Sequence, residues 1–268
     1  MFDPARNGQE QEERRTFWKA VPIEIDDDYS FLSDDSLIFR VGSRFLHWFA
    51  LIVLNMYNRV FFGLHVTGRR NLRGLPRSII TICNHVNMLD CSMVACACFD
   101  RMLYFPTLKS NLEIPFVRHL VKYLGGFPIP ETTKAFRSFS GKVQDILKEG
   151  DCVHFFPEGY LEPYAKGLRP FRRGAFVYAY DCGVPIVPFA ITYRRGTILR
   201  RMLRRKPPLT LHILEPVYPD LTSPKRVEVD RLMEECYRRM EAVCCPPPDQ
   251  RIPDTSEPID AMEEIYEY

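Results

Sequence analysis

A histidine and an aspartate follow a strand-like apolar run, and their types suit a general base and its partner. The segment reads Asn84-His85-Val86-Asn87-Met88-Leu89-Asp90. Histidine is the usual side chain that takes a proton from a hydroxyl near neutral pH, and its ring needs a partner that fixes the tautomer and stabilises the cation. Asp90 could be that partner if His85 lies on a loop and Asp90 begins the next helix. The alternative is that Asp90 only caps this helix.

A glutamate between proline and glycine follows a second strand-like run, in the segment Phe155-Phe156-Pro157-Glu158-Gly159. The proline stiffens the turn that carries Glu158, and Gly159 allows the backbone to approach a ligand closely. Taken alone, this segment could equally be an ordinary turn with a solvated glutamate. Because ligands of parallel α/β sheets bind beyond the carboxyl ends of the strands, both loops are candidates for a functional site.

Alternating strand and helix patterns indicate the elements that position these loops. Strands are expected at 78–83, 152–156, 184–193 and 209–214, and helices at 91–99, 112–124, 135–147, 173–181 and 227–243. The pattern predicts an α/β fold with a mostly parallel or mixed sheet and helices on both faces. Because the strand at 184–193 contains two prolines, its early part is expected at a sheet edge.

The segments outside this alternation differ in composition. Residues 1–35 form a polar, acidic arm, residues 67–243 the main domain, and residues 244–268 a proline-rich acidic tail. Residues 36–66 are mostly apolar and aromatic and are interrupted by arginines. This pattern predicts an amphipathic helix pair that docks on a membrane, or alternatively a helix buried against the domain. We expect neither a signal peptide nor a simple membrane-spanning helix. Arginines interleaved with apolar residues at 194–206 could add attraction to anionic lipid.

The overall composition excludes several classes of protein. Hydrophobic residues make up 46% and charged residues 26% of the chain, which is typical of a globular protein. The net charge of +2 gives no reason to expect nucleic acid as a partner. Nine cysteines without paired Cys-x-x-Cys spacing do not predict a zinc site and are expected to be reduced thiols in the cytoplasm.

Together the loops resemble the glycerolipid acyltransferase family typified by 1-acylglycerol-3-phosphate acyltransferase. The family's Asn-His-x-x-x-x-Asp and Phe-Pro-Glu-Gly blocks are present, and 124–129, 170–175 and 183–188 are similar to three further blocks in the family's order. The resemblance covers residues 62–217 and identifies 67–243 as an acyltransferase domain. It implies transfer of a fatty acyl group from acyl-CoA or acyl-carrier protein to the hydroxyl of a lysophospholipid or related glycerolipid, in phospholipid biosynthesis or remodelling.

The resemblance also implies a role for each matching residue. His85 and Asp90 are the expected catalytic residues. The expected substrate-binding residues are Asn84, Glu158, Gly159, Lys134, Arg172 and Arg173. The implied reaction needs no metal and no cofactor beyond the acyl donor, and the expected location is peripheral, on the cytoplasmic face of a membrane.

Two departures from the family pattern concern the acceptor. Pro130-Glu131 stands where the family has an arginine, and Tyr160-Leu161-Glu162 stands where it often has Thr-Arg-Ser. Because phosphate is best bound by a fork of arginine donors, these changes weaken the expectation of a phosphate-bearing acceptor. They also leave two alternatives open, a non-catalytic lipid-binding protein on the same fold and a lipid hydrolase.

Overall fold

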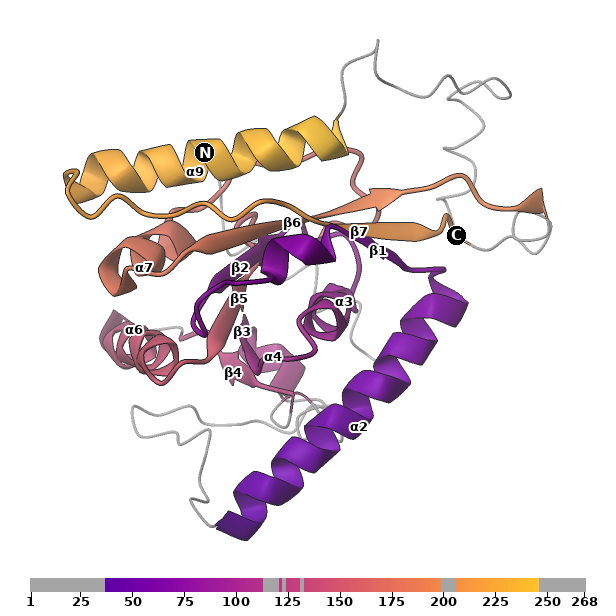
Figure 1. Cartoon of the computed structure of the whole chain (residues 1–268), viewed down its shortest axis with the longest axis horizontal. Helices are drawn as coiled ribbons and strands as arrows, with labels where there is room; N and C mark the ends of the chain where they lie inside the picture. The colour runs from indigo at the N-terminus through magenta and orange to yellow at the C-terminus, as the bar shows by residue number, and fades with distance from the viewer. Residues whose placement is uncertain (1–36, 113–120, 122–123, 131–132, 199–205, 246–268) are drawn as a thin grey trace.

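A mixed sheet of seven strands forms the centre of the protein (Figure 1). The computed structural model describes residues 37–112, 121, 124–130, 133–198 and 206–245. The strand order is β1-β7-β6-β2-β5-β3-β4, and only β6 and β7 pair antiparallel. The strands are β1 (His65–Thr67), β2 (Ile80–Cys83), β3 (Leu103–Thr107), β4 (Gly126–Pro128), β5 (Cys152–Phe155), β6 (Ile186–Tyr193) and β7 (Leu209–Ile213). The predicted α/β fold with a mixed sheet is therefore confirmed.

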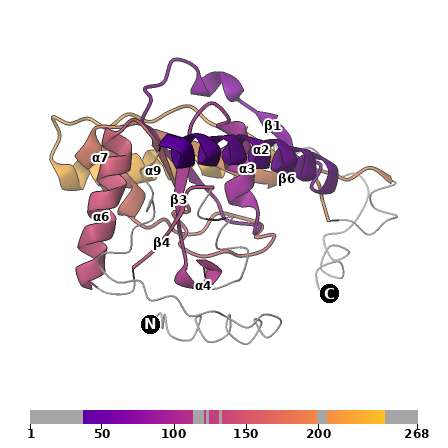
Figure 2. The ribbon, with the colours of Figure 1, turned by 90° about the horizontal axis from the view of Figure 1, so that it is seen from below.

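Helices cover both faces of this sheet. They are α2 (Leu37–Phe61), the short 3₁₀ helix η1 (Arg69–Leu72), α3 (Asp90–Ala97), α4 (Lys109–Leu112), α6 (Thr133–Lys148), α7 (Gly174–Cys182) and α9 (Lys225–Cys244). In β2, Cys83 packs with α2 and α3, whereas Ile80 and Ile82 pack with α6, α7 and α9. Figure 1 shows α2 and α9 on opposite sides of the sheet, and Figure 2 shows α6 and α7 at the end of the molecule away from β1.

Burial on both faces explains why the central strands could be predicted. All residues of β2 are buried, as are Cys152, Val153 and His154 of β5. A parallel strand between two helical layers reads as a continuous apolar run, which is the pattern present at 78–83 and 152–156. The outer strands β1, β3 and β4 were not predicted. β1 and β4 have only three residues each, and β3 and β4 each contain a proline, which weakens the local strand pattern.

The predicted edge position of the early part of the strand at 184–193 holds only in part, because β7 pairs with β6 from Phe189 onward. β6 lies inside the sheet, between β2 and β7. Pro188 is tolerated there because its missing N–H would face the β7 side, and β7 has ended by that point. The carbonyl of Pro188 still accepts the backbone N–H of Leu214 at 2.9 Å, one residue beyond the end of β7 at Ile213.

The apolar N-terminal segment forms one helix, α2, and not the predicted pair. One face of α2 packs on the domain: Leu51 is 1% exposed, and Asn58 donates to the hydroxyl of Ser92 in α3 at 3.1 Å. Among its described side chains, the large apolar ones that are more than half exposed are Phe45, Phe49, Ile52, Met56 and Val60. No helix among the described residues is long and apolar enough to cross a membrane. The helix predicted at 112–124 falls mostly outside the described residues.

Candidate active site

His85 and Asp90 form a hydrogen-bonded pair beyond the carboxyl end of β2. His85 lies on the loop and Asp90 is the first residue of α3, so the short loop between them turns the two side chains together. Nδ1 of His85 lies 3.1 Å from Oδ2 of Asp90. The carboxylate is fully buried, whereas the imidazole is 19% exposed. Among the described residues Nε2 of His85 has no hydrogen-bond partner, so this nitrogen remains available to a substrate.

The loop backbone holds the Asp90 carboxylate in place. Its Oδ2 accepts the backbone N–H groups of Val86 at 2.7 Å and Asn87 at 2.8 Å. Because an ionised carboxylate can only accept hydrogen bonds, Nδ1 of His85 carries the hydrogen and donates it to this oxygen, which leaves the lone pair on Nε2. Burial raises the pKa of Asp90, while the hydrogen bond from His85 and the two amides oppose the rise. The carboxylate therefore fixes the tautomer that a general base needs.

The imidazole of His85 stacks on an aromatic ring, which in turn contacts a second ring. The ring of His85 stacks on Phe156, with centroids 3.8 Å apart and planes 12° apart. Phe156 in turn lies edge-on to His154, with centroids 4.5 Å apart. His154 is buried in β5, where it pairs with the hydroxyl of Thr81 in β2 at 2.9 Å. Burial, with a further contribution from nearby His85, lowers the pKa of His154 to about 3, so His154 is neutral and does not add a charge beneath the base.

Glu158 links the second predicted loop to the first. Its Oε2 accepts the backbone N–H of His85 at 3.0 Å and also pairs with Nη2 of Arg169. The side chain of Glu158 is fully buried, which contradicts the alternative of a solvated turn glutamate. The two loops therefore meet at one edge of the sheet, where parallel β2 and β5 both end.

Among the other predicted substrate-binding residues, Asn84 is buried and bonded to the backbone, whereas Gly159 lies beside the exposed Arg172. The amide of Asn84 binds both backbone groups of Ile191 in β6, at 2.7 and 3.0 Å, and is buried. Gly159 has φ +83°, and an added Cβ would collide with the guanidinium of Arg172. Arg172 is exposed, and its guanidinium makes no hydrogen bond or ion pair within the described part of the chain.

The two remaining predicted contacts lie farther from the base. Arg173 pairs with Asp230 of α9 at 2.8 Å, so its charge is partly neutralised. Lys134 lies in the first turn of α6, and its side chain is outside the described residues. Arg172 is therefore the predicted cation that the structure leaves without a partner beside Gly159.

Sequence reasoning missed Arg169, Phe156 and His154. Arg169 directly precedes the basic run at 170–175, and nothing in its local pattern marks it. The available signal was indirect: a glutamate that follows a buried strand needs a cation or hydrogen-bond donors once it is buried. Phe156 and His154 read as ordinary strand residues, because a stack between two loops depends on the strand order.

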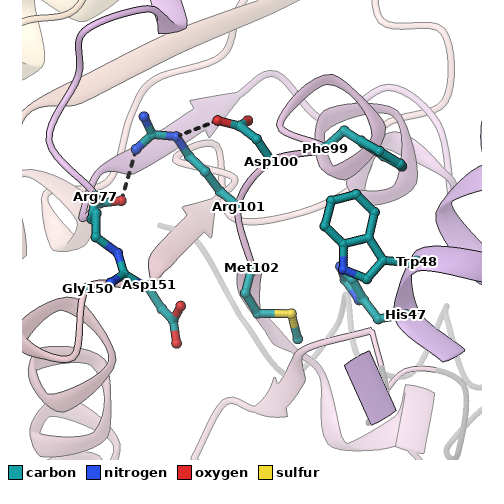
Figure 3. Close-up of a pocket in the computed structure, with 9 residues that line it drawn as sticks. All are labelled: His47, Trp48, Arg77, Phe99, Asp100, Arg101, Met102, Gly150 and Asp151. Atoms are coloured by element: carbon teal, nitrogen blue, oxygen red, sulfur yellow. Dashed lines mark hydrogen bonds and ion pairs between the residues drawn. The ribbon is translucent and has the colours of Figure 1, made fainter. Parts of the chain in front are cut away.

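A separate cavity of about 320 Å³ lies near the amino ends of the strands, opposite to the ends that carry the His85 and Glu158 loops. Figure 3 shows Arg77, Gly150 and Asp151 on one wall and His47, Trp48 and Phe99 on the other. Arg101 crosses the upper part and donates to the backbone carbonyl of Arg77 at 2.9 Å. The residues that line this cavity precede β2, β3 and β5, whereas the His85 loop follows β2, so the cavity is not part of the candidate active site.

Comparison with known proteins identifies relatives among acyltransferases. A model of the acyltransferase family matches residues 63–192. A 1-acyl-sn-glycerol-3-phosphate acyltransferase of Salmonella typhimurium is 30% identical over 196 residues, which cover 70% of this chain and 76% of that protein. The chloroplastic 1-acyl-sn-glycerol-3-phosphate acyltransferase BAT2 of Brassica napus is 24% identical over 153 residues, which cover 57% of this chain.

The extent of these matches differs between relatives. The aligned part of the chain spans 44% of the Brassica napus protein and 39% of a 1-acyl-sn-glycerol-3-phosphate acyltransferase of Chlamydomonas reinhardtii. Among solved structures, the 1-acyl-sn-glycerophosphate (LPA) acyltransferase PlsC of Thermotoga maritima has a TM-score of 0.55 and 20% identity. That match covers 78% of this chain and 89% of PlsC, and at this identity it shows the common fold.

Proposed function

Since the chain belongs to the acyltransferase family, we propose that it transfers a fatty acyl group from a thioester donor to the hydroxyl of a lysophospholipid or a related glycerolipid. The observation that carries this proposal is the His85–Asp90 pair, 3.1 Å apart, with Nε2 of His85 unpartnered among the described residues. A binding protein has no need of a histidine held in this tautomer. The pair therefore favours catalysis over lipid binding alone.

The proposed reaction uses His85 as both base and acid. Nε2 takes the proton from the acceptor hydroxyl as its oxygen attacks the carbonyl carbon of the acyl thioester. The negative charge of Asp90 stabilises the imidazolium that forms. When the tetrahedral intermediate collapses, the C–S bond breaks and the leaving sulfur takes the proton from His85. The ester bond thus forms directly, without an acyl-enzyme, and hydrogen-bond donors must stabilise the oxyanion during the transfer.

The charges near the site support a proposal about the acceptor. The relatives' names make 1-acylglycerol-3-phosphate the first acceptor to test. Arg169 is engaged by Glu158, and Arg173 by Asp230, which leaves Arg172 as the described cation beside the turn of Gly159. One arginine offers less to a phosphate dianion than a fork of two. We therefore expect that lysophosphatidate is not clearly preferred over acceptors that carry a headgroup or lack phosphate.

We further propose that the protein binds the cytoplasmic face of a membrane peripherally. The exposed apolar side chains of α2 support this location, because Phe45 is 74% exposed and Phe49 is 57% exposed on the helix surface that faces away from the domain. Burial of such side chains in the interfacial region of a bilayer is favourable, and a lysolipid acceptor stays in that bilayer.

An acyl-transfer assay tests the proposal. The native protein and a His85→Ala variant are incubated with labelled acyl-CoA or acyl-carrier protein and a panel of lysolipids. We expect labelled diacyl product from the native protein only. Release of free fatty acid that does not depend on an acceptor would identify a hydrolase instead. Lipid binding without any turnover would identify a non-catalytic binding protein, and either result would contradict the proposal.

A further inference from the structure

Glu158 is placed to hold the chain at His85 and cannot reach a substrate. Its carboxylate is fully buried, and both oxygens are engaged. Oε2 accepts the backbone N–H of His85 at 3.0 Å, and Oε1 accepts the backbone N–H of Arg169 at 3.2 Å. A charged group in this position requires a partner of opposite charge, which is the guanidinium of Arg169.

Arg169 holds the other side of the same residue. Its Nη2 donates to the backbone carbonyl of His85 at 3.2 Å and to that of Tyr160 at 2.8 Å. The guanidinium also lies 4.1 Å from the centre of the Tyr160 ring, and its side chain is only 12% exposed. Arginine suits this position because its planar fork can satisfy several acceptors in fixed directions.

We propose that Glu158 and Arg169 act as one positioning pair that grips the N–H and the C=O of His85 and thereby sets its imidazole between Asp90 and Phe156. The backbone N–H of His85 donates to a charged carboxylate and its C=O accepts from a charged guanidinium, and such charge-assisted hydrogen bonds are stronger than bonds between neutral groups. The same turn carries Phe156, whose ring stacks on the imidazole. The pair thus connects the loop that carries His85 to the turn that carries Phe156, the ring on which the imidazole stacks.

This role differs from direct recognition of the acceptor, and the two roles predict different kinetics. A residue that binds the acceptor changes KM when it is removed. A residue that positions the base changes kcat and leaves KM for the acceptor nearly unchanged. A displacement of a catalytic group by about 1 Å can reduce the rate about a hundredfold. The inference rests on the proposed role of His85 as the base, so its test also needs a readout that is independent of turnover.

Hydrogen exchange of the full chain supplies that readout. Three variants, Glu158→Gln, Arg169→Gln and Arg169→Lys, are compared with the native protein, with Arg238→Gln as the matched control. Arg238 is 67% exposed on α9 and pairs with Glu235, far along the chain from the site. We expect faster exchange in the peptide that covers 84–90 for the site variants and no change for the control. Exchange at 209–213 in β7 should stay slow, which shows that the domain remains folded.

Steady-state kinetics then separate positioning from recognition. We expect kcat to fall about 10- to 100-fold in the Gln variants, with KM for the acceptor within about threefold of native. The losses in Glu158→Gln and Arg169→Gln should not add in the double variant, because the two residues act as a unit. Arg169→Lys should recover little activity, since an ammonium group cannot reproduce the contacts of the fork.

The possible outcomes distinguish this inference from the proposed function. A rise in KM with unchanged kcat, or native exchange at 84–90 in all variants, would overturn the positioning pair. If the native protein transfers no acyl group to any acceptor, the proposed function fails. The exchange data still decide in that case whether Glu158 and Arg169 hold the His85 loop.

Discussion

Replacement of Asp90 by asparagine isolates the charge of the orienting carboxylate from its geometry. Oδ2 of Asp90 accepts three hydrogen bonds, from Nδ1 of His85 and from the amides of Val86 and Asn87. The two amides repel an NH₂ group, so the oxygen of the asparagine should take the place of Oδ2. The hydrogen bond to His85 then persists, and what the variant loses is the negative charge beside the imidazolium.

This geometry sets the size of the expected effect. General-base catalysis increases the rate of a reaction about a hundred- to ten-thousandfold. In Asp90→Asn the histidine keeps its tautomer, so we expect a loss at the lower end of this range. We expect kcat to fall about 100- to 1000-fold, equivalent to about 2.7 to 4 kcal/mol. The fold should be little affected because two terms oppose each other. The NH₂ group takes the place of Oδ1, which is buried without a partner in the described structure, and an unsatisfied donor there costs about 1–3 kcal/mol. Removal of a buried charge is favourable.

The sign of the pH dependence follows from the same burial. Because burial raises the pKa of Asp90, the folded protein binds this proton more tightly than the unfolded chain does. The contribution of Asp90 to the stability of the folded protein therefore falls as the pH rises. The fall begins at the ordinary pKa of an aspartate and ends at the raised pKa of the folded state. The Asp90→Asn variant should lack this fall.

Kinetics and thermal unfolding of the two proteins test these expectations together. At neutral pH the unfolding midpoints should agree within about 4 °C, since 1 kcal/mol shifts a protein of this size by about 2–4 °C. Native kcat in Asp90→Asn would refute the role of the carboxylate. A loss of activity accompanied by a large fall in the midpoint would show instead that Asp90 serves mainly to hold the fold.

Three further variants address the base, the Gly159 turn and the exposed face of α2. His85→Ala should reduce acyl transfer more than Asp90→Asn does, by up to about ten-thousandfold, with an unchanged circular dichroism spectrum; transfer at the native rate would exclude His85 as the base. Gly159→Ala should lower the free energy of unfolding in urea by about 1–3 kcal/mol because φ is +83°, whereas Gly141→Ala, in open space on α6, should raise it by up to about 1 kcal/mol. Phe49→Ser should weaken salt-resistant co-sedimentation with vesicles about tenfold, whereas Val227→Ser, which is equally exposed but on α9, should not; equal binding of both variants would place the docking surface elsewhere.

Local patterns in the sequence determined the residues of the proposed catalytic pair and the elements on either side of them. The run at 78–83 is apolar because β2 is buried on both faces, and the polar residues that follow mark the point where the strand ends. The His85–Asp90 pair is readable for the same reason. The two residues lie on one short loop, so their contact depends on local geometry and not on distant parts of the chain.

Contacts between distant segments were decided by the tertiary structure alone. β6 lies beside β2 because of the strand order. The side chain of Asn84, which follows β2, therefore forms hydrogen bonds with the backbone of Ile191 in β6. The tolerance of Pro188 in β6 likewise depends on where β7 ends.

The same reason explains the most important correction to the site, the grip of Glu158 and Arg169 on His85. Arg169 is remote from His85 in sequence and meets it only because β2 and β5 are adjacent and parallel, so that their following loops share one edge. Periodicity and spacing report which face of an element is buried. They do not report which element lies next to it, and every contact that supports the imidazole from outside its own loop depends on that arrangement.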